Sequence, residues 1–351
     1  MTLLMMSSTL SAYKISIFSI ALFAFSQTGC DVSQLNNPYP KADAGKSVLY
    51  SSFAERPKHL DPAVAYSSDE YGFIGQIYEP PLQYHYLKRP YQLQPLTANA
   101  MPVVRFLDQK GQPLPTTAPE SAIAYSEYLI DINPGIRYQP HPAFTQNAQG
   151  QLVYHQLTQT QLAGINTLSD FAEQQSRELT AEDYVYQIKR LAYPKIQSPI
   201  AELMAGYIDG FSEFAQSTAK LPITELKNQP MRGVEAINAH QYKIRIKGQY
   251  PQFQFWLAMP FFAPMPWEAD AFYAQPELKN KNISLDWFPV GTGPYWLEEN
   301  NPNRRMVLAK NPHYHADFYP SDGDVSDREK GWLEDAGKPL PLVDRVVYTL
   351  E

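Results

Sequence analysis

Few residues of this chain have the types and spacing that enzyme chemistry requires. Neither a Gly-x-Ser-x-Gly turn nor a His-Glu-x-x-His helix occurs among its 351 residues, so the usual motifs of serine hydrolases and zinc proteases are lacking. The paired carboxylates Glu182 and Asp183 follow Thr180, where capping of a helix accounts for them. We therefore expect a protein that is not an enzyme and has no cofactor.

His313 and His315 are the most closely spaced of the seven histidines. Two histidines at i and i+2, without a nearby carboxylate or third histidine in a clear pattern, are more typical of a protein surface than of a metal site. We therefore predict surface histidines and no bound metal.

The single cysteine, Cys30, ends a stretch with the three parts of a secretory signal peptide. Lys14 precedes an uncharged apolar run over residues 15–25, and small or polar residues follow up to Gly29. The run is shorter than the roughly 20 apolar residues that span a bilayer. Residues 1–30 are therefore predicted to be a leader, and a lone cysteine excludes disulfides within the chain.

Gly29-Cys30 resembles the lipobox of bacterial lipoproteins, in which the cysteine becomes the lipidated first residue, although Gln27 stands where leucine is usual. An ordinary cleaved leader and a helix of the fold are the alternatives. We expect Cys30 to anchor the protein in a membrane and residues 31–46 to form a flexible tether. Asp31 resembles the signal that keeps lipoproteins on the inner membrane, facing the periplasm.

Composition and periodicity predict a folded protein of mixed α/β type. The net charge of −7 argues against a nucleic-acid partner. A helix is expected from Ser67 to Tyr78, ended by the prolines after Glu79, and another behind Thr180. The remaining predictions are strands over 47–52, 124–132, 242–246 and 344–350, a hairpin over 293–299 and 305–310, a short helix over 212–219, loops over 139–176, and an aromatic core segment over 250–267.

Four segments in order resemble the family 5 extracytoplasmic solute-binding proteins, the peptide-binding receptors of bacterial ABC importers. The most specific is Gly291-Thr292-Gly293-Pro294-Tyr295, which precedes the predicted hairpin and then Asn311-Pro312-His313-Tyr314. The others are Leu60-Asp61-Pro62 with the helix after it, the strand that runs into Pro134-Gly135, and Leu179–Tyr186. We interpret Gly291–Tyr295 as scaffold, with glycines that permit a tight turn.

The resemblance implies a periplasmic-binding-protein-like fold of type II. One lobe would comprise residues 47–82 and 180–351, with a smaller subdomain inserted over residues 83–179. Since family members continue beyond the strand that residues 343–350 resemble, the second lobe is expected to be missing, and the chain to correspond to the N-terminal half of a receptor.

The resemblance also implies a function without catalysis, in which the protein binds extended peptides and delivers them to the permease subunits of an ABC importer. Tyr66, Ser67 and Ser68 match the segment that contacts the ligand backbone, although the two serines could equally well cap the helix. A lipid-anchored, periplasmic monomer is expected. An exported hydrolase or a structural envelope lipoprotein are the alternatives, and cargo containing nickel or haem stays open.

Overall fold

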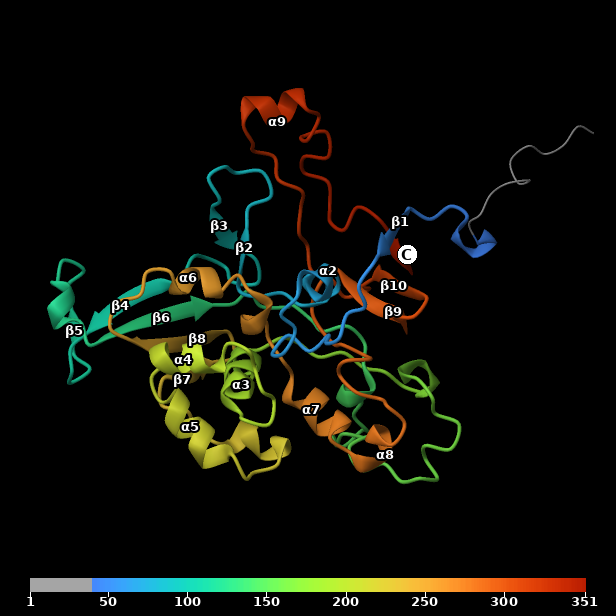
Figure 1. Cartoon of the computed structure of the whole chain (residues 1–351), viewed down its shortest axis with the longest axis horizontal. Helices are drawn as coiled ribbons and strands as arrows, with labels where there is room; N and C mark the ends of the chain where they lie inside the picture. Colours follow the sequence, from blue (N-terminus) through green and yellow to red (C-terminus); the bar gives the residue numbers. More distant parts are fainter. Residues whose placement is uncertain (1–39) are drawn as a thin grey trace, which may run out of the picture. The chain divides into compact units, whose positions relative to one another are not determined.

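The largest sheet in the computed structural model, which describes residues 40–351, is antiparallel with the strand order β5-β4-β6-β8-β7 (Figure 1). Along its strand β8, Tyr242, Ile244 and Ile246 are buried and the residues between them are not. This alternation confirms the predicted half-buried strand. The strands are β4 (Val103–Leu107), β5 (Pro113–Leu114), β6 (Tyr125–Asp131), β7 (Val234–Asn238) and β8 (Gln241–Lys247).

A second sheet has the order β1-β11-β10-β9 and joins segments from both ends of the described chain. Its β1 and β11 are parallel, with Val48 opposite Arg345. β9 and β10 form the predicted antiparallel hairpin. The strands are β1 (Val48–Phe53), β9 (Tyr295–Asn301), β10 (Arg305–Lys310) and β11 (Arg345–Leu350).

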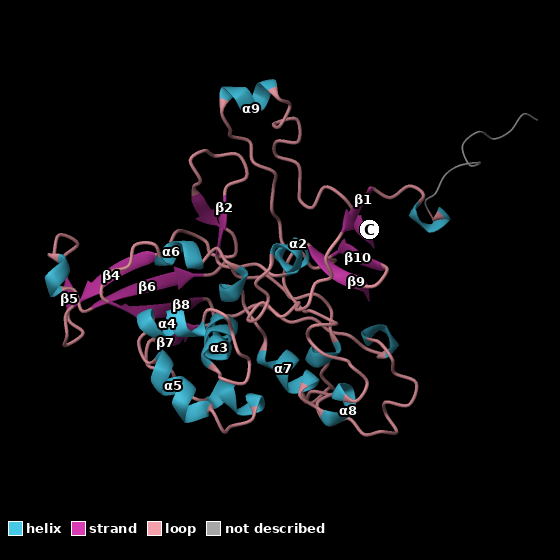
Figure 2. Cartoon of the chain, viewed as in Figure 1, coloured by secondary structure: helices cyan, strands magenta, loops and turns pink. Residues whose placement is uncertain are grey.

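The helix after Thr180, α3 (Ala181–Ala192), covers one face of the five-stranded sheet and contacts β7 and β8. Its capping box confirms the helix predicted behind Thr180, and all of its residues except Glu182 are buried, among them Tyr184, Ile188 and Leu191. Figure 2 shows α3, α4 and α5 on the same side of this sheet. The other helices are α2 (Ser68–Ile77), α4 (Ala201–Tyr207), α5 (Phe211–Thr218), α6 (Phe253–Trp256), α7 (Trp267–Tyr273) and α8 (Pro276–Lys279).

A long excursion over residues 311–344, here called the arm, carries α9 (Val325–Glu329) and packs against the hairpin of β2 (Leu82–Tyr84) and β3 (Leu93–Pro95). Asp322 of the arm lies 3.1 Å from His85 Nε2 and 2.7 Å from Lys88 Nζ. The rings of Tyr86 and Tyr319 stack with centroids 6.3 Å apart. Two segments far apart in the sequence are thereby held side by side, as Figure 1 shows.

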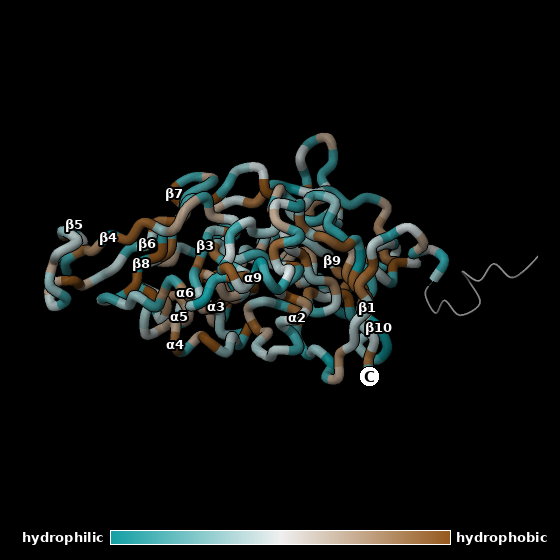
Figure 3. Tube along the Cα trace, turned by 90° about the horizontal axis from the view of Figure 1, so that it is seen from above, coloured by the Kyte–Doolittle hydropathy of each residue, from teal (hydrophilic) through white to brown (hydrophobic). Residues whose placement is uncertain are grey.

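Hydrophobic stretches coincide with the strands of both sheets (Figure 3). In the aromatic segment over 250–267, Phe253, Phe261 and Phe262 are buried as predicted, whereas Phe255 is 39% exposed and stacks on Tyr84. Residues 139–176 contain two three-residue 3-10 helices, Pro142–Phe144 and Leu168–Asp170, and are otherwise loops and turns, as expected.

Residues 46–351 form one compact unit. The five-stranded sheet takes β4, β5 and β6 from the predicted subdomain over 83–179 and β7 and β8 from beyond it, so this sheet crosses the boundary, and the domain division stays a prediction. Within residues 40–351, no helix is long and apolar enough to cross a membrane. The predicted leader, Cys30 and Asp31 lie outside the described residues. Of the predicted tether, Lys41–Asp43 forms a 3-10 turn.

Candidate ligand-binding site

The segment before α2 begins with a turn that Asp61 stabilises. Its Oδ1 accepts a hydrogen bond from the Ala63 backbone N–H at 2.9 Å, a bond typical of an aspartate in a turn. Asp286, which lies more than 200 residues further along the chain, accepts hydrogen bonds from the backbone N–H groups of Leu60 (2.9 Å) and Asp61 (3.2 Å). The turn is therefore fixed at both its side chain and its main chain.

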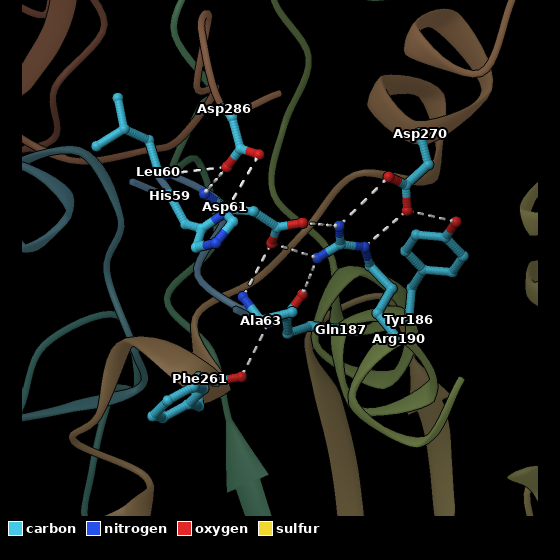
Figure 4. A network of polar contacts seen from close by, with 10 residues as sticks. All are labelled: His59, Leu60, Asp61, Ala63, Tyr186, Gln187, Arg190, Phe261, Asp270 and Asp286. Carbon is cyan, nitrogen blue, oxygen red and sulfur yellow. Dashed lines mark hydrogen bonds and ion pairs between the residues drawn. The ribbon is translucent and has the colours of Figure 1, made fainter. Parts of the chain in front are cut away.

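A buried ion network connects this turn to helices α3 and α7. Figure 4 shows Arg190, whose side chain is 1% exposed, between Asp61 at 2.6 Å and Asp270 at 2.7 Å. The Tyr186 hydroxyl donates a further hydrogen bond to Asp270. Burial raises the pKa of Asp270, and the charge of Arg190 opposes that shift. Because solvent does not reach Arg190, we assign the network to positioning the segment and not to ligand contact.

Glu70 fixes the second half of the segment. Its carboxylate accepts hydrogen bonds from four backbone N–H groups: Lys58 (3.2 Å), His59 (2.9 Å), Tyr66 (2.8 Å) and Ser67 (3.0 Å). Burial alone would raise the pKa of Glu70, but these donors outweigh it and lower the pKa. The charged carboxylate thereby holds the main chain of residues 58–67 in one conformation.

The predicted ligand-contacting residues lie on the surface at the start of α2. Ser67 is the helix cap, and its Oγ accepts a hydrogen bond from the Glu70 N–H in a complete capping box. The capping interpretation is thus confirmed for Ser67, while the predicted contact with a ligand stays a prediction. Tyr66 is 73% exposed and Ser68 is also exposed. Among the described residues, no hydrogen bond uses the Tyr66 carbonyl or the Ser68 N–H.

The motif Gly291–Tyr295 lies against the other end of α2. The Gly293 N–H donates to the Ile77 carbonyl at 2.9 Å, and Asn311 binds the Gly293 carbonyl through its side chain at 2.9 Å. A Cβ atom on Gly293 would lie 2.6 Å from the Gln76 carbonyl oxygen. The glycines thus permit the main chains to approach closely, and in these contacts the motif has a structural role.

A cavity of about 600 Å³ opens between α2, the β2–β3 hairpin and the base of the arm. Its lining is rich in tyrosine and includes Glu79, which is 2% exposed. The tyrosines that the cavity presents are Tyr71, Tyr84, Tyr86, Tyr91 and Tyr314. Because Tyr71 is one turn of α2 from Ser67 and Ser68, the exposed segment and the cavity are neighbouring parts of one surface.

Glu79 pairs with His315, whose Nε2 lies 2.9 Å from Glu79 Oε1. Burial opposes protonation of His315, but the hydrogen bond and the charge of Glu79 outweigh it and raise the pKa. His315 is 17% exposed at its side chain, so the prediction of a surface histidine is wrong for it, whereas His313 is exposed. Among residues 40–351, no group of three histidine, cysteine or acidic side chains could hold a metal ion.

From the sequence, Glu79 indicates only the end of a helix, and the cavity is not predicted. One local signal is the density of tyrosine around the short hairpin: Tyr84, Tyr86 and Tyr91 lie within it, and Tyr78 precedes it. The partner residues Tyr314 and Asp317 come from the arm, more than 220 residues away, and the pattern of the hairpin carries no information about them.

Comparison with known proteins decides the family. The model of the bacterial extracellular solute-binding proteins, family 5, middle region, matches residues 174–350, just over half of the chain. The chain belongs to this family. Two curated relatives from Escherichia coli K12 are the periplasmic oligopeptide-binding protein OppA, 32% identical over 137 residues, and the periplasmic murein peptide-binding protein MppA, 31% identical over 137 residues. Each alignment covers 39% of this chain and 23% of the relative.

Solved structures give the same fold for this family 5 protein. The murein tripeptide-binding protein MppA of Escherichia coli superposes with a TM-score of 0.52 at 18% identity, over 87% of this chain and 42% of that one. OppA of Listeria monocytogenes bound to peptide gives 0.52 at 13% identity, over 88% and 43%. The predicted periplasmic-binding-protein-like α/β fold is thus confirmed. The chain spans less than half the length of these relatives.

Proposed function

We propose that this chain binds extended peptides along Tyr66–Ser68 and delivers them to an ABC importer, without catalysis. The observation that carries the proposal is the exposed main chain at this segment, which Glu70 holds in place by accepting hydrogen bonds from the Tyr66 and Ser67 N–H groups. Ser67 is extended (φ −84°, ψ 158°) and is flanked by the Tyr66 carbonyl and the Ser68 N–H. One residue of a parallel peptide strand can donate to the former and accept from the latter.

A backbone substitution tests this pairing. Ser68 is the first residue of α2, a position where proline is favoured, so Ser68→Pro removes the N–H without breaking the helix. Ser68→Ala keeps the N–H and is the matched control. By calorimetric titration of the purified chain with alanine tripeptides, we expect Ser68→Pro to weaken binding about five- to tenfold, the value of one hydrogen bond.

Three outcomes would overturn the proposal. The first is an equal affinity of the Ser68→Pro and Ser68→Ala variants for tripeptide. The second is the absence of binding by the unmodified chain across a mixed tripeptide pool analysed by mass spectrometry. The third is turnover of the bound peptides, which would favour an exported hydrolase.

The lipid anchor is a separate part of the proposal and rests on the sequence around Cys30. We expect the mature chain to begin at Cys30 and to carry acyl groups, which intact mass spectrometry of the protein purified from membranes would detect. Cys30→Ser would release the chain from the membrane fraction. An unmodified mature chain that starts elsewhere would contradict the anchor but leave peptide binding unaffected.

The proposed location is the outer face of the inner membrane, with the chain as a monomer beside the permease subunits. Asp31, next to Cys30, supports this address. Membrane fractionation of wild type and Asp31→Ser would test it, with movement of the variant to another membrane expected. Light scattering of the purified chain would test the monomer, and cross-linking in membranes would test contact with a permease.

A further inference from the structure

We infer that the cavity beside α2 binds a positively charged side chain of the ligand, the alkylammonium of lysine or the guanidinium of arginine. This inference rests on the proposed peptide binding and names the ligand class that the site selects. It is based on the charges in the lining of the cavity, on the rings in that lining and on the position of both relative to Tyr66–Ser68.

Glu79, which lines the cavity, has a carboxylate oxygen that lacks a partner. Oε1 of Glu79 pairs with His315, whereas Oε2 is buried and has no hydrogen-bond partner among the described residues. A buried, unpaired carboxylate oxygen is costly, and a cationic donor from a ligand would satisfy it.

A second carboxylate adds negative charge at the same place. Asp317 also lines the cavity, and its Oδ2 lies 3.2 Å from the Tyr314 hydroxyl. Burial, followed by the charges of Asp317 and Glu79, raises the pKa of Tyr86 to about 12. Both carboxylates are therefore close enough to the Tyr86 hydroxyl to act on it.

The positive groups of the cavity leave this charge partly uncompensated. His315 faces Glu79 Oε1 only. Arg89 is exposed, lies over the ring of Tyr91 at 5.0 Å, and donates hydrogen bonds to the carbonyls of Lys88 and Tyr86. His85, which also lines the cavity, pairs with Asp322. Among residues 40–351, Arg89 forms no ion pair with Glu79 or Asp317, so His315 is the positive partner of these two carboxylates.

The walls suit the same ligand group. Tyr71, Tyr84, Tyr86 and Tyr91 line the cavity with between 39% and 68% of their surface exposed. The face of an aromatic ring attracts an ammonium or guanidinium group through the negative face of its quadrupole. An apolar ligand group would bury the rings equally well but would leave Glu79 Oε2 unpaired.

The exposed face of α2 connects the cavity to the proposed peptide site. Ser68, Tyr71, Gly72 and Gly75 share this face, and a side chain at Gly72 would meet no other atom within 4 Å. The rise of a helix places Gly75 about 10 Å from Ser68, a distance that about three extended residues span. A peptide held at Tyr66–Ser68 can therefore place a side chain in the cavity.

The test compares three tripeptides, Ala-Lys-Ala, Ala-norleucine-Ala and Ala-Glu-Ala, by calorimetry on the full chain. We expect lysine to be preferred about tenfold over norleucine, which has similar length and no charge, and glutamate to bind most weakly. Glu79→Gln should reduce the lysine preference to within about threefold. If Glu79→Gln unfolds, Asp317→Asn provides the second variant. The control is Glu120→Gln, because Glu120 is an exposed carboxylate that does not line the cavity.

Equal affinities for the lysine and norleucine peptides in the unmodified chain would overturn the inference and leave peptide binding intact. Failure of every tripeptide to bind would instead overturn the proposed function. A diazirine analogue of lysine in the peptide gives an independent readout. We expect its cross-links within residues 71–91 or 314–317, and cross-links elsewhere alone would also refute the inference.

Discussion

Gly291 lies directly against the main chain of Ile77, the last residue of α2: a Cβ atom on Gly291 would fall 2.0 Å from the Ile77 carbonyl oxygen. No real Cβ atom approaches an oxygen so closely, so glycine is required where the helix meets the 291–295 segment. The two ends of α2 are thus fixed by different means, the start by a capping box and the end by a close approach of main chains.

We predict that Gly291→Ala destabilises the protein strongly, by about 3 kcal/mol or more, since backbone atoms would have to move. Denaturant unfolding measures the change. Gly72→Ala is the matched control within α2, because its added methyl group meets no atom within 4 Å. It should stabilise the protein by up to about 1 kcal/mol, since alanine is the better helix former. Equal effects of the two substitutions would contradict this explanation.

Arg190→Met should destabilise the protein by about 3–5 kcal/mol, because it leaves Asp61 and Asp270 buried without their shared cation. The exposed pair of Lys338 and Asp335 provides the comparison, and Lys338→Ala should cost less than about 1 kcal/mol. Thermal unfolding of both variants measures the difference. A small effect of Arg190→Met would show that the network is not needed to hold the turn at Asp61.

Glu70 makes stability depend on pH in the acid range. Its pKa in the folded protein is lowered, so its contribution is complete above about pH 4.5 and is lost as the pH falls through the folded pKa. We predict that the wild type loses stability in this window and that Glu70→Gln, less stable by about 1–3 kcal/mol at pH 7, loses less. Unfolding midpoints between pH 3 and 7 would show it, and parallel curves for the two proteins would be evidence against this role.

His315 makes the stability of the protein depend on pH in the direction opposite to Glu70. Its folded pKa is raised, so its contribution is complete below the unfolded value of about 6.5 and is lost as the pH rises through the folded pKa. NMR titration should give a midpoint above 6.5 for this histidine, and Glu79→Gln should lower it. A midpoint that does not respond to Glu79→Gln would exclude the pair as its cause.

The elements predicted from the sequence are those that short stretches specify. Ser67 with Glu70, and Thr180 with Asp183, are capping boxes that need only residues three positions apart, and the alternation along Tyr242–Ile246 is equally local. The contacts that form the site, by contrast, join residues that are far apart in the sequence. Asp286 reaches Leu60 across 226 residues, and His315 reaches Glu79 across 236. No spacing rule predicts such contacts.

The error at His315 has the same origin. Judged only from the residues next to it in the sequence, a histidine two positions from another histidine is most simply interpreted as a surface residue. Its partial burial accompanies its contact with Glu79, which lies on a distant segment of the chain. The two prolines after Glu79 mark the end of a helix, as predicted, but they carry no information about the cavity that Glu79 lines, because distant segments form it.

The position of β11 between β1 and β10 constrains how the protein folds. Val48 and Arg345 are paired although almost 300 residues separate them, so β1 has no neighbour within its sheet until nearly all of the described chain has been synthesised. Contacts of such high sequence separation form slowly. A nascent chain would therefore expose β1 for much of its synthesis, and this sheet can be completed only when the chain is almost whole.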